Sequence, residues 1–289
     1  MTYMNQPRNV FPAQHQDVQP GTESVMTPAP VYDNPAYRPA NKLQEKTALV
    51  TGGDSGIGRA VALAYAKEAA NVVIAYLNED SDADETVALI RAIGGNAVKI
   101  RVDLKSEDEA AKAVKFTVDS FGGLDVLVNN AAVQYPQDSI SDISREQFIH
   151  TFESNIYSYF FATKAALPHL ESKSGSTIIN TASVVAFKGN PRLIDYSSTK
   201  GAIVSFTRSM AMSLVKQGIR VNAVAPGPVW TPLIVSSFSA EEAAVFGSDT
   251  PMGRAAQPYE LAPMYVFLAN DDSSNITGQV FHVNGGEWM

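Results

Sequence analysis

Short unbroken runs of apolar residues alternate, from position 46 onward, with longer stretches whose apolar positions recur every three or four residues. An unbroken run is typical of a strand buried on both faces of a sheet, and the longer period indicates a helix with one apolar face. Because strands separated by helices pair in parallel, we predict an α/β, doubly wound fold with a seven-stranded parallel sheet, in a single domain of residues 42–289. The predicted strands are residues 47–53, 71–77, 96–104, 124–132, 176–183, 219–227 and 279–286, and the predicted helices are residues 57–70, 82–95, 106–122, 145–170, 196–216 and 258–270.

The first 41 residues have a different character from the rest. They are rich in Pro, Gln, Asn and Asp and show neither helical nor strand periodicity. We interpret residues 1–41 as an N-terminal arm, extended or partly disordered. The arm also carries apolar side chains that would gain by burial on a folded surface, so docking is equally open for Phe11, Val31, Tyr32 and Tyr37.

Composition narrows the range of partners. The net charge of -8, with a pI near 5.0 and no run of five basic residues, argues against nucleic acid or an anionic membrane as a partner. The chain has no cysteine, and its four histidines show no metal-ligand spacing, so we expect no metal site. With no signal-like start and no apolar run of about 20 residues, we expect a cytoplasmic protein acting on a small molecule.

A glycine-rich turn, TGGDSGIG, follows the first predicted strand at residues 51–58. Gly52 permits a sharp turn, Gly56 leaves room for a pyrophosphate, and Gly58 allows close packing of helix on strand. The helix that starts near Ile57 would point its free N–H groups at the phosphates, with Asp54 and Ser55 completing the turn. An ordinary strand-to-helix turn could carry the same glycines, but its place on the first strand favours a dinucleotide site. An NTPase is disfavoured, because the Gly-Lys-Ser/Thr ending is missing.

The candidate reacting groups come later in the chain. Tyr196 and Lys200 are four residues apart on a predicted helix, which places a phenol and an ammonium on one face. A nearby cation would lower the tyrosine pKa from about 10, so that Tyr196 becomes a general acid/base for hydride transfer. Ser183 ends a predicted strand at the edge where such sheets bind ligands, and its hydroxyl would hold the substrate oxygen. Each residue alone is more typical of a solvated face or a cap; together they predict catalysis.

Residues 129–132 (NNAA) and 226–232 (PGPVWTP) complete a set of motifs in a characteristic order. From about Leu43 to the end the chain resembles the classical short-chain dehydrogenase/reductase family, and it looks like the general-stress or glucose/ribitol-dehydrogenase-like subgroup with an N-terminal arm. The resemblance implies a Rossmann fold, an NAD(P)-dependent oxidoreductase and a homotetramer. It also implies that Lys200 bonds the nicotinamide ribose and that Asn155 supports a water chain behind that lysine. Enoyl reductases similar to this family have a wider Tyr-to-Lys spacing, which leaves the interconversion of an alcohol and its aldehyde or ketone.

The same resemblance implies the cofactor contacts. From the adenine through the ribose to the nicotinamide they are Asp103 and Leu104, Asn129 and Ala131, and Pro226, Gly227, Val229 and Thr231. Asp103 would serve equally well as a helix-flanking cap.

The choice between NAD and NADP depends on the end of the second predicted strand, where Tyr76 stands. No Arg or Lys lies in residues 76–80, and the carboxylates of Asp54, Glu79 and Asp80 would repel a 2′-phosphate. We therefore predict a slight preference for NAD over NADP. The acidic side chains here are more typical of surface charges that complement a helix dipole than of a glycosidase pair: Glu79, Asp80, Asp82, Asp84 and Glu85.

Residues 231–258 form a connection longer than most in α/β folds. We interpret the segment as a mobile substrate lid, with a plain surface excursion as the alternative. Trp230, Phe238 and Phe246 would line an apolar wall facing Gln134 and Tyr135, unless they pack in the core.

Two questions stay open on sequence. A dinucleotide-binding, stress-related scaffold with vestigial activity is the competing function, which the intact Ser183, Tyr196 and Lys200 argue against. Apolar faces on two predicted helices suit either the core or a subunit interface: Phe148, Phe152, Tyr159 and Phe160 on one, and Ile203, Phe206 and Met210 on the other.

Overall fold

The computed structural model describes residues 11–173 and 175–289, and a seven-stranded sheet with all neighbouring strands parallel lies at its centre. The order across the sheet is β3-β2-β1-β4-β5-β6-β7. The predicted doubly wound fold is confirmed, with one strand in each predicted interval. The strands are β1 (Thr47–Thr51), β2 (Asn71–Tyr76), β3 (Asn96–Arg101), β4 (Val126–Asn129), β5 (Thr177–Thr181), β6 (Arg220–Pro226) and β7 (Val280–Val283).

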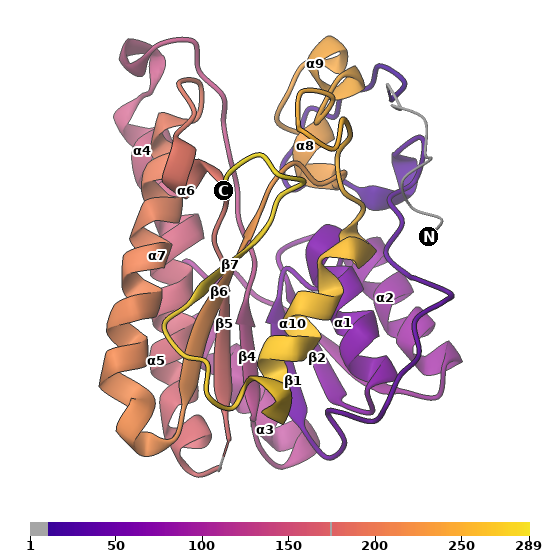
Figure 1. The fold of residues 1–289 in the computed structure, drawn as a ribbon, viewed down its shortest axis with the longest axis vertical. Helices are drawn as coiled ribbons and strands as arrows, with labels where there is room; N and C mark the ends of the chain where they lie inside the picture. The colour runs from indigo at the N-terminus through magenta and orange to yellow at the C-terminus, as the bar shows by residue number, and fades with distance from the viewer. Residues whose placement is uncertain (1–10, 174) are drawn as a thin grey trace.

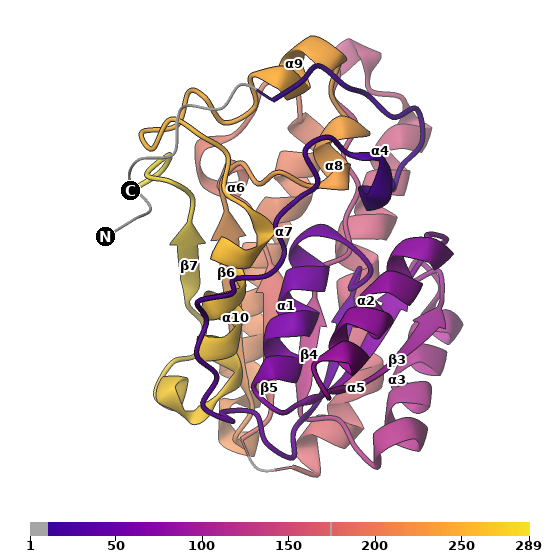
Figure 2. The ribbon, with the colours of Figure 1, turned by 90° about the vertical axis from the view of Figure 1, so that its right-hand side faces the viewer.

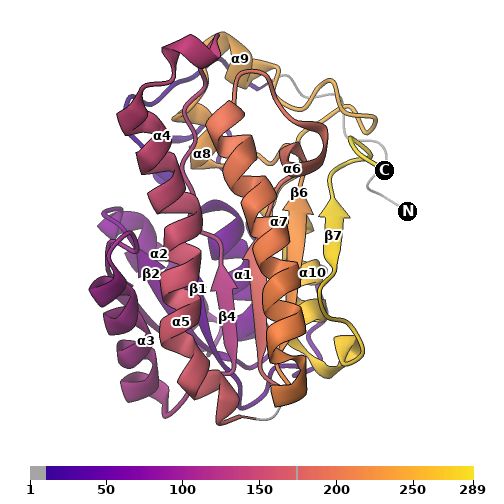
Figure 3. The same ribbon diagram turned by 90° about the vertical axis from the view of Figure 1, so that its left-hand side faces the viewer.

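Helices cover both faces of the sheet (Figure 1). Figure 2 shows α1, α2 and α10 on one face, and Figure 3 shows α3, α5 and α7 on the other. The α-helices are α1 (Gly56–Lys67), α2 (Asp80–Ala92), α3 (Glu107–Phe121), α4 (Arg145–Phe152), α5 (Ser158–Glu171), α6 (Val185–Lys188), α7 (Ile194–Leu214), α8 (Pro232–Val235), α9 (Ala240–Ala244) and α10 (Ala262–Ala269). Short 3₁₀ turns are η1 (Glu23–Val25), η2 (Ile140–Asp142), η4 (Val215–Gln217), η5 (Pro258–Glu260) and η6 (Asp271–Ser273). None of the helices in the described part of the chain is long and apolar enough to cross a membrane.

The strands are unbroken apolar runs because helices cover both faces of the sheet. Alternate residues of each strand enter opposite cores: Leu49 and Val73 pack beneath α3, α5 and α7, whereas Val50 and Ile74 pack beneath α1, α2 and α10. Both sets are fully buried, so these central positions are apolar, and in β1 the buried polar residues Thr47 and Thr51 stand at the two ends of the strand.

The helix predicted over residues 145–170 is not regular throughout. A π-helical turn, η3 (Glu153–Tyr157), separates α4 from α5. Such turns are rare and are frequent at functional sites. This one carries Asn155, whose side chain is fully buried.

Residues 11–30 of the arm lie with the lid segment at the carboxyl ends of the strands, and the rest of the arm runs past α1 and α10 toward the opposite end of the sheet (Figures 1 and 2). Of the arm's predicted docking residues, Phe11 is buried, Tyr32 packs against the core beside α1, and the hydroxyl of Tyr37 donates to Glu68; Val31 stays 45% exposed. Residues 1–10 of the predicted arm lie outside the described residues. The lid segment contains α8 and α9.

Candidate active site

A cavity of about 380 Å³ opens at the carboxyl edge of the sheet, beside the point between β1 and β4 where the strand order reverses. Open α/β sheets bind ligands at this kind of place. Most of the predicted site residues line it: Gly52, Asp54, Ser55, Gly56, Ile57, Tyr76, Asp103, Leu104, Ala131, Ser183, Tyr196, Lys200, Pro226, Gly227, Val229 and Thr231. Three predicted residues, Gly58, Asn129 and Asn155, lie outside its wall.

The glycine positions of the turn have no space for a larger residue. Gly52 and Gly56 adopt positive φ angles of 59° and 51°, which other residues rarely adopt. A Cβ atom on Gly58 would lie 1.8 Å from the carbonyl oxygen of Gly52, and one on Gly56 would lie 3.0 Å from Thr231 Cγ2. The bare backbone at the start of α1 thus forms one wall of the cavity, which is the cradle that a dinucleotide's phosphates need.

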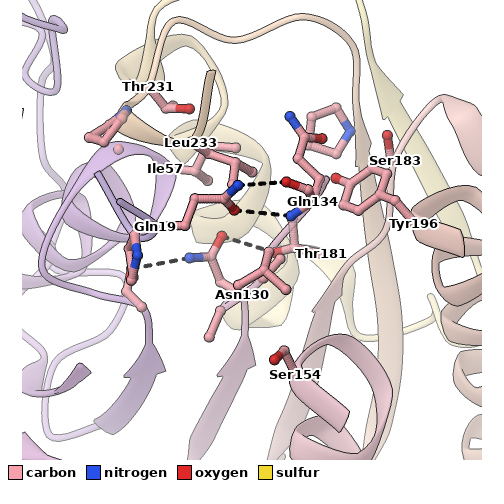
Figure 4. Close-up of a pocket in the computed structure, with 18 of the residues that line it drawn as sticks. Gln19, Ile57, Asn130, Gln134, Ser154, Thr181, Ser183, Tyr196, Thr231 and Leu233 are labelled. Carbon is pink, nitrogen blue, oxygen red and sulfur yellow. Dashed lines mark hydrogen bonds between the residues drawn. The ribbon is translucent and has the colours of Figure 1, made fainter. Parts of the chain in front are cut away.

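The catalytic cluster, which we define as Ser183, Tyr196 and Lys200, lies on the opposite wall. Ser183 follows β5, while α7 supplies the other two side chains. Ser183 and Tyr196 hydrogen-bond through their hydroxyls, and both point into the cavity (Figure 4). Lys200 Nζ lies 5.4 Å from the centre of the Tyr196 ring and donates to the Thr181 carbonyl oxygen at 2.8 Å. The structure therefore brings the three predicted groups together.

Burial governs the proton affinities of this cluster. It raises the pKa of Tyr196 to about 12, which the hydrogen bond with Ser183 reduces only in part. It also lowers the pKa of Lys200 to about 7, because a buried ammonium loses its hydration. We expected the charge of Lys200, together with that of an oxidised nicotinamide, to lower the tyrosine pKa. Burial has the larger effect in this structure, and the contribution of the nicotinamide stays a prediction.

Asn155 acts on the neighbouring loop. Its Oδ1 accepts from the Val133 N–H at 2.8 Å, and its Nδ2 donates to the Val133 carbonyl at 2.9 Å and to Thr199 Oγ1 at 3.2 Å. The amide thus fixes the loop after β4 against the helix that carries Tyr196 and Lys200. The water chain that the family resemblance implies stays a prediction.

Asn130 lines the cavity, whereas Asn129, which we predicted to do so, does not. Asn129 points into the protein, where its amide nitrogen donates to Asn180 Oδ1 at 2.9 Å and Thr163 Oγ1 at 3.2 Å. Asn130 lines the cavity and donates to the carbonyls of Thr51 and Gly52 at 3.1 and 3.2 Å. The alternation of side chains along a strand could have assigned the two asparagines to opposite faces.

The far end of the cavity is acidic. Burial raises the pKa of Asp54 to about 6, and burial together with the Asp54 charge raises that of Glu79 to about 7. The Tyr76 hydroxyl donates to Asp80 at 2.6 Å, and Asp103 accepts from the Lys105 N–H at 3.0 Å, so Asp103 shapes a turn as well as lining the cavity.

The surface-charge interpretation of the acidic stretch is right only in part. Asp80, Asp84 and Glu85 expose about half of their side chains or more, at 56%, 70% and 45%. Glu79 and Asp82 are buried instead. Asp82 is buried because its Oδ2 accepts from the N–H of Glu23, a residue of the arm that local sequence does not reveal.

Trp230 does not form a cavity wall. Its ring is fully buried and stacks on Phe11 of the arm at 3.7 Å and 7°, so core packing is the correct alternative. Phe238, Phe246, Gln134 and Tyr135 do line the cavity. Further residues line the cavity that no sequence motif indicates, because they come from distant segments of the chain: Gln19, Pro20, His150, Lys188, Asn190 and Glu287.

Two comparisons with known proteins define the family. The family model described as enoyl-(acyl carrier protein) reductase matches residues 52–287, from the glycine-rich turn almost to the end of the chain. A crystal structure of a short-chain type dehydrogenase/reductase from Mycobacterium marinum superimposes with a TM-score of 0.80 at 32% identity, covering 86% of this chain and 97% of that one. The chain belongs to the short-chain dehydrogenase/reductase family. As a member it is an NAD(P)-dependent oxidoreductase.

Relatives in this family are similar over almost their whole length, arm included. General stress protein 39 of Bacillus subtilis (strain 168) is 54% identical, covering 99% of each chain. The glucose and ribitol dehydrogenase of Daucus carota is 53% identical, covering 96% of each. The NADPH-dependent aldehyde reductase 1, chloroplastic, of Arabidopsis thaliana is 50% identical, covering 94% of this chain and 96% of the relative. The predicted subgroup is thereby confirmed.

Proposed function

We propose that this short-chain dehydrogenase/reductase interconverts a small alcohol and its aldehyde or ketone by hydride transfer, with Tyr196 as the general acid/base. The observation that carries the proposal is the convergence of Ser183, Tyr196 and Lys200 on one wall of a cavity whose opposite wall is a side-chain-free helix start. Relatives that are named as acting on sugars, polyols or aldehydes support it.

The proton chemistry follows from the cluster's geometry. Ser183 would hydrogen-bond the reacting oxygen and hold it beside the Tyr196 hydroxyl, which takes the proton of an alcohol or gives one to a carbonyl. An oxidised nicotinamide bound against this wall would supply the hydride acceptor and a positive charge. A pKa of about 12 keeps Tyr196 protonated at neutral pH, so the free enzyme is ready for carbonyl reduction, and alcohol oxidation should speed up as the pH rises.

The cofactor contacts that we propose use the lining residues. The start of α1 would take the pyrophosphate, with Gly56 allowing a close approach of the backbone and Ile57 offering its N–H, because the Gly56 N–H already donates to Glu23. Lys200 would bond the nicotinamide ribose. Thr231 and Val229 lie where the carboxamide would be held, and Asn130 replaces Asn129 among the residues near the ribose.

We propose a slight preference for NAD. Asp54 and Glu79 line the far end of the cavity, and their negative charges above neutral pH would repel a 2′-phosphate. The NADPH-dependent relative makes the opposite outcome a clear alternative. Titration of the protein with NAD⁺ and with NADP⁺ under identical conditions decides between them.

We also propose a cytoplasmic homotetramer. An apolar patch on η3, α5 and α7, with Tyr157 and Phe160 about half exposed, suits burial between subunits. Phe148, at 44% exposure, extends the patch along α4, whereas Tyr159 and Ile203 belong to the core.

The decisive test is Tyr196→Phe, assayed with both cofactors against sugars, polyols and aldehydes. Loss of only the transferable proton should lower kcat by about 10³-fold and leave the Kd for the cofactor within about twofold. Activity near that of the wild type would refute the assigned role. If the unaltered protein bound a dinucleotide firmly but turned over nothing, the dinucleotide-binding, stress-related scaffold would be the better description.

A further inference from the structure

The arm and the lid segment form one small layer with its own core. Phe11 stacks on Trp230, and the Phe11 N–H donates to the Ala244 carbonyl at 2.8 Å. The indole N–H of Trp230 donates to the carbonyl of Pro28 at 2.9 Å. Further on, the Gln16 N–H donates to the Val235 carbonyl at 2.7 Å. The arm therefore spans the lid from α9 to α8.

The same arm is anchored to the opposite wall of the cavity. Glu23 Oε2 accepts from the N–H of Gly56, the first residue of α1, at 2.6 Å, and Oε1 lies 2.8 Å from Arg59 Nη1. Glu23 is 2% exposed and Arg59 is 1% exposed. Burial raises the pKa of Glu23 to about 7 in spite of the Arg59 charge. Glu23 is not part of the cavity wall, so it supports the glycine-rich turn from behind and leaves the phosphate side open.

Gln19 lies between these two attachments, and its side chain enters the cavity. Its Nε2 donates to the carbonyls of Gln134 at 2.6 Å and Ser236 at 3.3 Å, while its Oε1 accepts from the Gln134 N–H at 3.2 Å. In Figure 4 the Gln19 amide faces Gln134, and Gln134 lies between Gln19 and the catalytic Tyr196. One side chain thus joins the loop after β4 to the lid helix α8.

We propose that Gln19 is a positioning residue of the active site, whose amide holds α8 and the loop after β4 at the separation that encloses the dinucleotide. The inference rests on the proposed function, because it assigns a role in holding its cofactor. While these three hydrogen bonds are made, a bound cofactor is enclosed, and cofactor exchange requires that Gln19 release Gln134 and Ser236. The arm then sets how long a dinucleotide stays bound, although it lies outside the domain that carries the family's motifs.

The test compares three variants of the full chain by stopped-flow measurement of cofactor release and by calorimetric Kd. Gln19→Ala removes all three hydrogen bonds and should raise the Kd for the preferred dinucleotide about tenfold, through faster release. The melting temperature of the free protein should fall slightly, because Gln134 and Ser236 lose hydrogen-bond partners, so the release rate is the readout that decides. The matched control is Gln14→Ala. Gln14 lies in the same arm, and within the described part of the chain its amide bonds only to the arm residues Pro12 and Thr27, so the Kd of this variant should stay within about twofold of the wild-type value.

Gln19→Glu gives a readout that a merely structural role would not change. It keeps the acceptor for the Gln134 N–H, loses both donors and adds a negative charge to the cavity wall. This charge would repel an anionic dinucleotide, so the Kd of Gln19→Glu should rise more than that of Gln19→Ala and fall again with added salt. Release rates equal to those of the wild type in Gln19→Ala and Gln19→Glu would overturn the role of Gln19 and leave the proposed function in place. If the unaltered protein bound neither NAD⁺ nor NADP⁺, the proposed function itself would fail.

Discussion

The catalytic cluster and the arm–lid layer, which we define as residues 11–30 with residues 231–258, face each other across one cavity but are built in different ways. Ser183, Tyr196 and Lys200 come from β5 and α7, elements of the family's sheet and helices, and are buried by that framework. The arm–lid layer consists of α8, α9, the 3₁₀ turn η1 and irregular chain, joined by backbone hydrogen bonds, side-chain hydrogen bonds and one aromatic stack. The comparison suggests that the framework fixes the chemistry, while the layer controls access to it.

The largest effect is expected at the catalytic cluster. Lys200→Met should lower kcat by about 10³-fold, because it removes the buried amine beside Tyr196 and leaves the Thr181 carbonyl without its donor. Steady-state assays of Lys200→Met and of the surface variant Lys164→Met provide the comparison, since Lys164 is paired on the surface with Glu107. A folded Lys200→Met enzyme within tenfold of normal turnover would contradict the assignment.

A smaller but still large effect is expected where the arm is anchored. Glu23→Ala leaves the Gly56 N–H without its acceptor and removes one of the two carboxylates that contact Arg59 Nη1, which should lower the free energy of unfolding by about 2 kcal/mol. Urea titration measures it. Asp17→Ala, on the same arm with a side chain 97% exposed, should change stability by less than about 0.5 kcal/mol. Equal losses in the two variants would show that the anchor contributes nothing specific.

An effect of about 1 kcal/mol is expected within the lid. Ser239 caps α9 in a reciprocal box with Glu242, so Ser239→Ala should destabilise that helix by about this amount. Hydrogen exchange across residues 240–246 would detect it, together with a slightly weaker affinity for the cofactor. Ser106→Ala removes a similar cap from α3, far from the layer, and should leave cofactor affinity unchanged. If both variants weakened cofactor binding alike, the lid would have no special role.

The smallest effect concerns cofactor preference. The pKa values of Asp54 and Glu79, about 6 and about 7, lie above those of ordinary carboxyls, so both groups gain protons as the pH falls from 8 to 6. Repulsion of a 2′-phosphate then weakens, and the ratio of the Kd for NADP⁺ to that for NAD⁺ should fall about three- to fivefold. Glu79→Gln should flatten this dependence, whereas the exposed Asp84→Asn should not. A ratio independent of pH in the wild type would remove the electrostatic argument for NAD.

Sequence predicts the sheet, its helices and the catalytic cluster, but it does not predict the arm–lid layer. The strands, the glycine-rich turn and the catalytic cluster carry local signals: apolar runs, glycines at fixed spacing, and a Tyr–Lys pair one helical turn apart. Gln19, Glu23 and Phe11 carry none, because their partners lie from 33 to more than 200 positions away. For the same reason sequence leaves open whether Trp230 lines the cavity or packs in the core, since the ring that covers it belongs to the arm.

Sequence also did not predict which acidic side chains are buried. Glu79 and Asp82 occur in an acidic run that is typical of a solvated helix start, and Asp82 is buried because the Glu23 N–H reaches it. Nothing in the local pattern distinguishes Asp82 from Asp84, whose side chain is 70% exposed.

The stack of Phe11 on Trp230 gives the molecule an optical reporter of its own. The chain has two tryptophans, and Trp230 is fully enclosed whereas Trp288 is 41% exposed. Lifting the arm would bring water to the enclosed indole and shift its emission to longer wavelength, so detachment can be followed in real time without an added label. Replacing Trp288 with Phe would leave a single emitter that reports on this one contact.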